Sequence, residues 1–276
     1  MNGHMKRLTQ AETKKALQGT GIEKSGASWV VYADPWKRVR YDFHRHSKHQ
    51  LLYAFSGTLY LETEDGFWIL PPERAAWIPA GTKHATTLNN ATCYSVSFDP
   101  KWMGGAGGGV KIMAVTPLLR EMIGYAAEWK VKSGRRNDFA EKFFGVMARL
   151  CEEGREMPYR LPRARTEAIG RVVEWVVGNP AEADLAGAAR VAKMSMRTFR
   201  RRFPEEMRMS WREYLHLVRM LKGMELLGTE MNVTEVALAV GFDSVSSFGK
   251  GFSAFTSENP LEYKKRVCGF NGAALD

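Results

Sequence analysis

The sequence predicts an α+β protein in which a small antiparallel β-barrel with following helices precedes an all-α domain. Between residues 29 and 98, short runs of β-branched, aromatic and leucine residues alternate with turn signals, which is typical of such a barrel. From about residue 118 onward, apolar residues recur at helical spacing. Roughly the last ninety residues contain one helix-turn-helix pattern twice.

Composition limits the classes of protein to consider. The chain has 276 residues, enough for two domains, and a formal net charge of +10, which suits a polyanionic partner. Its three cysteines lack a CxxC pair, which argues against a disulfide framework or a zinc finger. No apolar run approaches the roughly 18 residues of a membrane span, and the N-terminus has no signal-peptide core. We therefore expect a cytoplasmic protein with no membrane partner.

The expected strands cover 51–55, 58–62, 67–70, 76–78 and 93–98, with turns at 56–57, 64–66, 71–72 and 79–81. The glycine-rich stretch 104–109 is interpreted as a loop without a functional role. Two helices follow, one carrying an apolar stripe over 118–126 and one over 139–150, with a charged loop at 130–138. The stripe fits either a dimer interface or simple packing on the barrel.

Each C-terminal repeat starts with a helix of small apolar residues, which allow another helix to cross closely, and continues with a turn and a second helix. Capping residues for the second helices are expected at Ser195 and Asp243, and each helix has aromatic anchors four residues apart. Capping boxes at Ser210 with Glu213 and at Asn232 with Glu235 open a long connecting helix, through residue 227, and the next repeat. The anchors are Phe199 and Phe203 in the first repeat, and Phe248 and Phe252 in the second.

A candidate ligand pocket lies in the barrel region. His44, His46 and Gln50 have the same parity in a strand-like run, so their side chains should share a face, inward if Leu52 also packs inward. His49 has the opposite parity and should point elsewhere. His84 follows the sharp turn 79–83, and together this is the spacing of cupin metal sites.

Gln50 stands where metal-binding cupins usually carry glutamate. A neutral amide is a weaker ligand than a carboxylate, so affinity for a divalent ion should fall and redox-active iron chemistry becomes less favoured. Three interpretations stay open: a divalent metal site, a metal-free polar pocket for a small molecule, and histidines with only a structural or surface role.

With both patterns in hand, the chain resembles the AraC/XylS-type transcriptional regulators with an N-terminal cupin sensor. The resemblance rests on 50–53, 71–81, 161–162, 210–221 and, most specifically, 241–263. It implies a cupin-like effector-binding or dimerisation domain over 20–157, a linker over 158–166, and a double helix-turn-helix DNA-binding domain over 167–268. It also implies a regulator, most often an activator, that acts as a homodimer on promoter DNA, with a small-molecule effector and RNA polymerase as further partners.

Carried over to this chain, the first recognition helix spans about 195–203 and the second about 244–255. Arginine pairs bidentately with guanine, so the first helix should read bases, while Arg202 contacts phosphate. The short side chains of the second helix should discriminate less strongly between bases. The expected DNA-binding residues are Met196, Arg197, Arg200, Arg201, Arg202, Val245, Ser246, Ser247 and Lys250.

Several departures from the family pattern concern local geometry. Pro204 should end or kink the first recognition helix near Phe203. Arg208 replaces a glycine at a place that favours left-handed backbone. Gly249 and Gly251 each cost about 1 kcal/mol in a helix interior, which suggests that the second recognition helix is frayed and orders on DNA.

Two other functions compete with an effector-controlled regulator. One is a cupin metalloenzyme fused to a nucleic-acid-binding module, against which Gln50 and the absence of nucleophile, P-loop or dinucleotide motifs argue. The other is an architectural DNA binder with a vestigial sensor. We expect no enzymatic activity.

Overall fold

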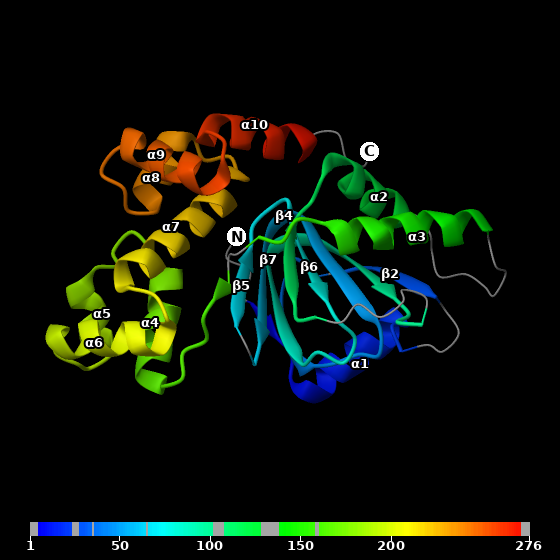
Figure 1. Ribbon diagram of the computed structural model, residues 1–276, viewed down its shortest axis with the longest axis horizontal. Coiled ribbons are helices and arrows are strands. Elements are labelled where there is room, and N and C mark those ends of the chain that lie inside the picture. The colour runs from blue at the N-terminus through cyan, green and yellow to red at the C-terminus, as the bar shows by residue number, and fades with distance from the viewer. Residues whose placement is uncertain are drawn as a thin grey trace. The chain divides into compact units, whose positions relative to one another are not determined.

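The computed structural model describes residues 5–23, 28–34, 36–64, 66–101, 108–127, 138–157 and 160–271. Two compact units are present: Met1–Glu64 with Trp68–Tyr159, and Asp65–Phe67 with Arg160–Asp276 (Figure 1). Most of the expected glycine-rich loop, nearly all of the charged loop, and residues 158–159 of the expected linker lie outside the described residues. No helix in the described segments is long and apolar enough to cross a membrane.

The first unit is built on one sheet whose central strand is β7 (His84–Phe98). Strand β4 (His49–Thr63) pairs with β7 along its whole length, whereas β3 (Arg38–His44) and β2 (Trp29–Ala33) pair with successive halves of its other edge. β6 (Arg74–Ile78) joins β4 to β8 (Lys111–Ala114), and β5 (Phe67–Leu70) and β1 (Lys6–Arg7) complete the sheet in this unit. All of these register pairs are antiparallel except β1 with β3, which confirms the predicted antiparallel architecture.

The predicted turn at 56–57 is wrong, because β4 runs straight through it. Its register with β7 shifts on both sides of Ser56, and Gly57 adopts φ +73°. A Cβ on Gly57 would lie 2.2 Å from the carbonyl oxygen of Asn90 on β7, so only glycine fits this close approach. The glycine therefore lies within one long strand, opposite a bulge of β7.

The first of these register shifts also changes which residues of β4 face inward. Before it, Leu52 and Ala54 belong to the cluster inside the barrel; beyond it, Leu59 and Leu61 do, so the inward parity has switched. The register shift between Ala54 and Ser56 inserts one residue into β4, and it reverses the parity because side chains alternate between the two faces of a strand. Leu52 packs inward as expected.

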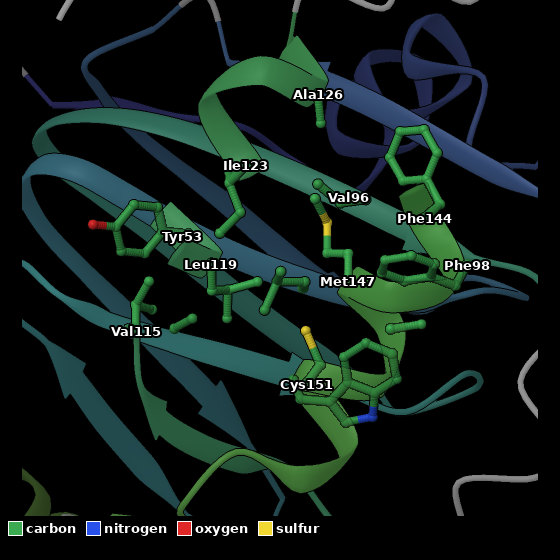
Figure 2. Close-up of a cluster of buried hydrophobic side chains, with 14 of the residues drawn as sticks. Tyr53, Val96, Phe98, Val115, Leu119, Ile123, Ala126, Phe144, Met147 and Cys151 are labelled. Carbon is green, nitrogen blue, oxygen red and sulfur yellow. The ribbon is translucent and has the colours of Figure 1, made fainter. Parts of the chain in front are cut away.

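A second cluster lies between the outer face of the sheet and two helices, α2 (Pro117–Ala127) and α3 (Asp138–Glu153). Figure 2 shows Leu119 and Ile123 of α2, with Phe144 and Met147 of α3, gathered over Val96 of β7. Most of the predicted apolar stripe therefore packs on the barrel, and Leu118 remains exposed.

An N-terminal helix that the sequence analysis did not predict also belongs to this unit. α1 (Gln10–Thr20) opens with a capping box between Thr9 and Glu12. The Thr13 hydroxyl accepts a hydrogen bond of 3.0 Å from the Asp42 amide of β3, which fixes the helix against the barrel. A domain that starts at residue 20 would leave this helix out.

The second unit confirms the tandem helix-turn-helix pattern. A short strand, β9 (Arg160–Leu161), precedes α4 (Glu167–Gly178), and the first motif is α5 (Leu185–Val191) with α6 (Met196–Met207). The long helix α7 (Trp211–Leu227) leads to the second motif, α8 (Val233–Ala239) with α9 (Val245–Thr256), and α10 (Pro260–Asn271) follows. Both predicted capping boxes, at the starts of α7 and α8, are present.

Two local predictions about the recognition helices are wrong. The N-cap of α9 is Ser244, whose hydroxyl accepts from the Ser247 amide, and not Asp243. Pro204 does not end α6, which continues to Met207, so the part of the prediction that ended the helix near Phe203 is wrong. Phe199, Phe203 and Met207 are all fully buried along one face of α6, and this packing outweighs the hydrogen bond that proline cannot make.

Candidate DNA interface and effector pocket

Helix α6 presents a basic face opposite its buried aromatic side. Arg197 and Arg201 are four residues apart and therefore lie on one stripe, with Arg201 about 200° around the helix from Phe199. Arg200 and Arg202 flank this stripe. No salt bridge involving these four arginines occurs among the residues that the structure describes, so their guanidinium groups are available to an external anion.

The second recognition helix, α9, has the same design with fewer charges. Phe248 and Phe252 are buried, and Ser246 and Lys250 lie on the opposite stripe. All nine predicted DNA-contacting side chains of α6 and α9 are exposed. Gly251 lies close to His216 of α7. A Cβ added at residue 251 would lie 3.1 Å from His216 Cε1, so the absence of a side chain allows this close packing.

Arg219 of α7 ties the two motifs together. Its guanidinium donates hydrogen bonds to the carbonyl oxygens of Pro180, at 3.1 Å, and Ala183, at 3.4 Å, both in the loop before α5. The same group lies 5.9 Å from the ring centre of Phe242, in the turn of the second motif. Sequence analysis did not single out this residue, because nothing local distinguishes it from the other arginines of the chain.

In the first unit, His44, His46 and His84 form a cluster in which one ring nitrogen of each lies within 4.8 Å of the others. His44 ends β3 directly opposite His84, the first residue of β7, whereas His46 lies in the turn before β4. The premise of one continuous strand from His44 to Gln50 is therefore wrong. The side chains still gather, because β3 and β4 border the same central strand from its two sides.

Backbone carbonyls fix the orientation of all three rings. The Nδ1 atoms of His44, His46 and His84 lie 2.8, 2.7 and 2.9 Å from the carbonyl oxygens of Asp42, Lys48 and Thr82, respectively. A carbonyl can only accept, so each Nδ1 carries a proton and donates it. In a neutral ring, Nε2 is then left with a free lone pair.

Gln50 completes the cluster, whereas His49 faces away from it. The Gln50 Oε1 atom lies 3.0 Å from His46 Nε2, and its Nε2 donates to the Ser95 hydroxyl at 2.6 Å. His49 stacks on Trp77 with ring centres 5.4 Å apart, and its Nδ1 accepts from the Ala80 amide. The opposite orientation of His49 agrees with its predicted parity.

The rings of the cluster are held neutral by their surroundings. Burial, followed by the charge of His46, lowers the pKa of His44 to about 4. Burial is also the main cause that lowers the pKa of His46, and it lowers that of His84 further, helped by the two other rings. Neutral rings are the form that offers an Nε2 lone pair to a metal ion or a ligand proton.

Two regions of space adjoin the cluster. An interior cavity of about 40 Å³ is lined by His44, Gln50 and Ser95, and by Tyr41 and Asp34, which share a hydrogen bond of 2.7 Å. Burial raises the pKa of Asp34. A larger cavity of about 880 Å³ lies between α1 and the turn after β3, and its lining includes His44, His46, Lys14 and Arg45.

Sequence reasoning missed several polar residues of this pocket and the helix that borders it. Asp34, Tyr41 and Ser95 come from three different segments, and α1 supplies Leu17 to the lining of both cavities. No short motif joins these residues. They could have been identified only if the pairing of the strands had been known, because the pairing decides which side chains face inward.

Comparison with known proteins matches both units to families. Residues 28–157 match the AraC-like ligand binding domain, and residues 188–266 match a helix-turn-helix domain. The HTH-type transcriptional regulator NimR of Escherichia coli (strain K12) is 27% identical over 230 residues, which cover 81% of this chain and 82% of NimR. The HTH-type transcriptional regulator MtrA of Neisseria gonorrhoeae is 33% identical over 99 residues, which cover 35% of this chain and 33% of MtrA.

A solved structure of an apo ToxT variant from Vibrio cholerae strain SCE256 aligns over 88% of this chain and 98% of that chain, with 14% identity and a TM-score of 0.38. The family matches and the curated relatives are those of transcriptional regulators and not of enzymes, which excludes the metalloenzyme alternative. The chain belongs to the AraC-type transcriptional regulators, with an N-terminal ligand-binding domain and a C-terminal helix-turn-helix domain that binds DNA.

Proposed function

We propose that the protein is a sequence-specific activator of transcription controlled by a small-molecule effector bound in the barrel pocket. The observation that carries the proposal is the cavity beside the histidine cluster, which lies in the ligand-binding domain and is bounded by α1. A ligand there contacts a separate helix as well as the sheet. It can therefore favour one arrangement of the domain over another through differential binding.

Base reading is assigned mainly to the first recognition helix. Met196, Arg197, Arg200 and Arg201 are exposed on α6 and face the major groove in this proposal, with Arg202 on phosphate. The weaker reading face is on α9 and consists of Val245, Ser246, Ser247 and Lys250.

Arg200→Ala or Arg201→Ala should cost about 1–3 kcal/mol of binding free energy on the specific site and relax discrimination there. Arg202→Ala should weaken binding to all sequences and flatten the salt dependence.

Activation, as opposed to repression, is proposed from the family resemblance, with RNA polymerase as the partner that an activator would contact.

Homodimerisation is proposed through the outer faces of α2 and α3. Leu118, Tyr125, Phe139 and Val146 are 59%, 45%, 59% and 53% exposed, a concentration of apolar surface that a second copy of the chain would cover. Val146→Glu should shift the protein towards monomer in sedimentation measurements, whereas Lys15→Glu, at an exposed position of α1, should not.

The decisive experiment compares DNA from upstream of the protein's own and neighbouring genes with random duplex, by fluorescence anisotropy over a series of salt concentrations. A preference of about a thousandfold or more supports a specific regulator. Equal, steeply salt-dependent binding to both DNAs in the presence of candidate effectors contradicts it and favours an architectural binder. That alternative also predicts unchanged DNA affinity when His44, His46 and His84 are all replaced.

A further inference from the structure

We propose that His44, His46, His84 and Gln50 hold a divalent transition-metal ion, and that the effector is an anion that binds this ion through oxygen. The inference rests on the proposed function in one respect only: it takes the barrel pocket as the effector site. It names the chemical class of the ligand and the residues that select it.

The first support is the convergence of lone pairs. All three histidines donate their Nδ1 protons to backbone carbonyls, so in the neutral rings Nε2 is the unprotonated atom. This arrangement, with the second ring nitrogen held by a carbonyl, is the one that metal-bound histidines adopt. Imidazole nitrogens in this number suit zinc, iron, nickel or copper.

The second support is a buried nitrogen with no partner. His84 is fully buried, and its Nε2 is among the buried polar atoms without a hydrogen bond. Leaving such an atom unsatisfied is costly in free energy. His84 belongs to the cluster in which one ring nitrogen of each histidine lies within 4.8 Å of the others. A single ion would therefore satisfy this nitrogen together with its neighbours.

The third support is the orientation of Gln50. Its Nε2 donates to Ser95, which directs Oε1 towards His46 Nε2 at 3.0 Å. In this orientation Oε1 and the Nε2 atom of His46 both present lone pairs to the space that a metal ion would occupy, so Oε1 is the fourth ligand in this proposal.

The charge of this site determines the class of effector. Four neutral ligands leave the +2 charge of the ion uncompensated in a partly closed cavity, and such a charge requires a counter-ion. Lys14 and Arg45 add positive charge to the lining of the larger cavity. Glu23, which also lines this cavity and accepts hydrogen bonds from the amide and hydroxyl of Ser47, offsets only one of these positive charges. A small carboxylate that binds the ion and extends towards Lys14 and Arg45 fits these features.

The metal is tested by titrating the full-length, chelator-treated protein with Co²⁺ and recording its visible absorption. We expect bands typical of a nitrogen-ligated site at one ion per chain. His84→Ala should weaken binding on the order of 100-fold, and Gln50→Glu, which supplies the missing negative charge, should strengthen it about tenfold or more. His49→Gln is the matched control, since His49 faces away from the cluster, and should leave binding unchanged.

Absence of these bands in the wild-type protein, or equal loss of binding in the His49 control, overturns the metal site. Gln50→Glu is expected to bind Co²⁺ more tightly. A variant that merely failed to fold could not give this result. A decrease in affinity in that variant would also overturn the assignment of Gln50 as a ligand.

The effector class is tested on the Co²⁺-loaded protein with oxalate and with oxamide, its neutral analogue. Oxalate should shift the cobalt bands and oxamide should not; Lys14→Gln and Arg45→Gln should each weaken the oxalate response severalfold. Equal responses to the two probes, or none, overturn the anionic effector. None of these readouts involves DNA, so failure of the proposed regulator in the anisotropy experiment remains a separate result.

Discussion

The two helix-turn-helix motifs have the same backbone design but different chemistry. Counting from the N-caps Ser195 and Ser244, both recognition helices bury phenylalanine at their fourth and eighth positions, and both end at a left-handed residue, Arg208 with φ 56° and Ser257 with φ 68°. The exposed positions differ. Arg201 of α6 corresponds to Lys250 of α9, and Arg200 and Arg202 correspond to glycines. The buried anchors set the shape of the motif, while the exposed positions remain free to specialise.

The turns of the two motifs differ for a reason that lies outside them. Lys193 occupies the left-handed position of the first turn with φ 56°, and Gly241 occupies that of the second with φ 84°. A Cβ on Gly241 would lie 2.7 Å from the Arg219 guanidinium and 2.8 Å from the Ala181 backbone. The second turn is therefore packed against the loop before the first motif, and only glycine fits there.

Breaking the connection between the motifs should have the largest effect. Arg219→Met removes two hydrogen bonds from a charged group to carbonyls and should cost roughly 1.5–3 kcal/mol of folding free energy. It should also weaken binding to a complete operator more than to DNA that contains only the site of the first motif. Arg212→Met, at an exposed position of the same helix, is the control for chemical denaturation and for anisotropy. Equal loss on complete and half operators would contradict a role in positioning the two motifs.

A direct comparison of equivalent residues should show the next largest effect. Arg201→Ala should cost about 1–3 kcal/mol on the specific operator, because arginine reads guanine with two hydrogen bonds. Lys250→Ala, at the equivalent position of α9, should cost less than about 1 kcal/mol and change discrimination little. Anisotropy with single-base operator variants measures both. If the two losses match, the motifs contribute equally and the proposed asymmetry is wrong.

The glycines of α9 allow a smaller and more selective change. Gly249→Ala should stabilise the free helix by about 1 kcal/mol, since nothing lies within 4 Å of the added Cβ. Gly251→Ala should gain less, because its Cβ would press on His216. Amide hydrogen exchange of the free protein checks the prediction that α9 is frayed. Full protection of α9 in the wild-type protein would show that the two glycines do not loosen it.

The smallest expected effect concerns the left-handed residue at the end of α6. Arg208→Gly relieves about 1–2 kcal/mol of left-handed backbone strain but adds about 0.5–1 kcal/mol of glycine entropy, so a net gain of about 0.5 kcal/mol is expected. Ser257→Gly should act similarly in the second motif. Urea unfolding measures both, and a loss of stability would indicate that the Arg208 side chain contributes contacts of its own.

The sequence by itself determined the features that depend on neighbours a few residues apart. Capping boxes at Ser210 and Asn232 and the paired aromatic anchors are local, so spacing alone predicted them, whereas the left-handed position at Arg208 followed from the family pattern. The antiparallel class of the first unit also followed from alternating patterns and turn signals. Even local signals failed where packing was stronger, as when α6 continued through Pro204.

Only the tertiary structure decided the features that depend on strand register. The register shift between Ala54 and Ser56 reverses the inward parity of β4, and the register between β3 and β7 places His44 opposite His84. Spacing suggested which histidines belong together, but it could not supply Asp34, Tyr41 or α1, nor the direction of the Gln50 amide. These depend on contacts between residues distant in the chain, and their energies are absent from any local pattern.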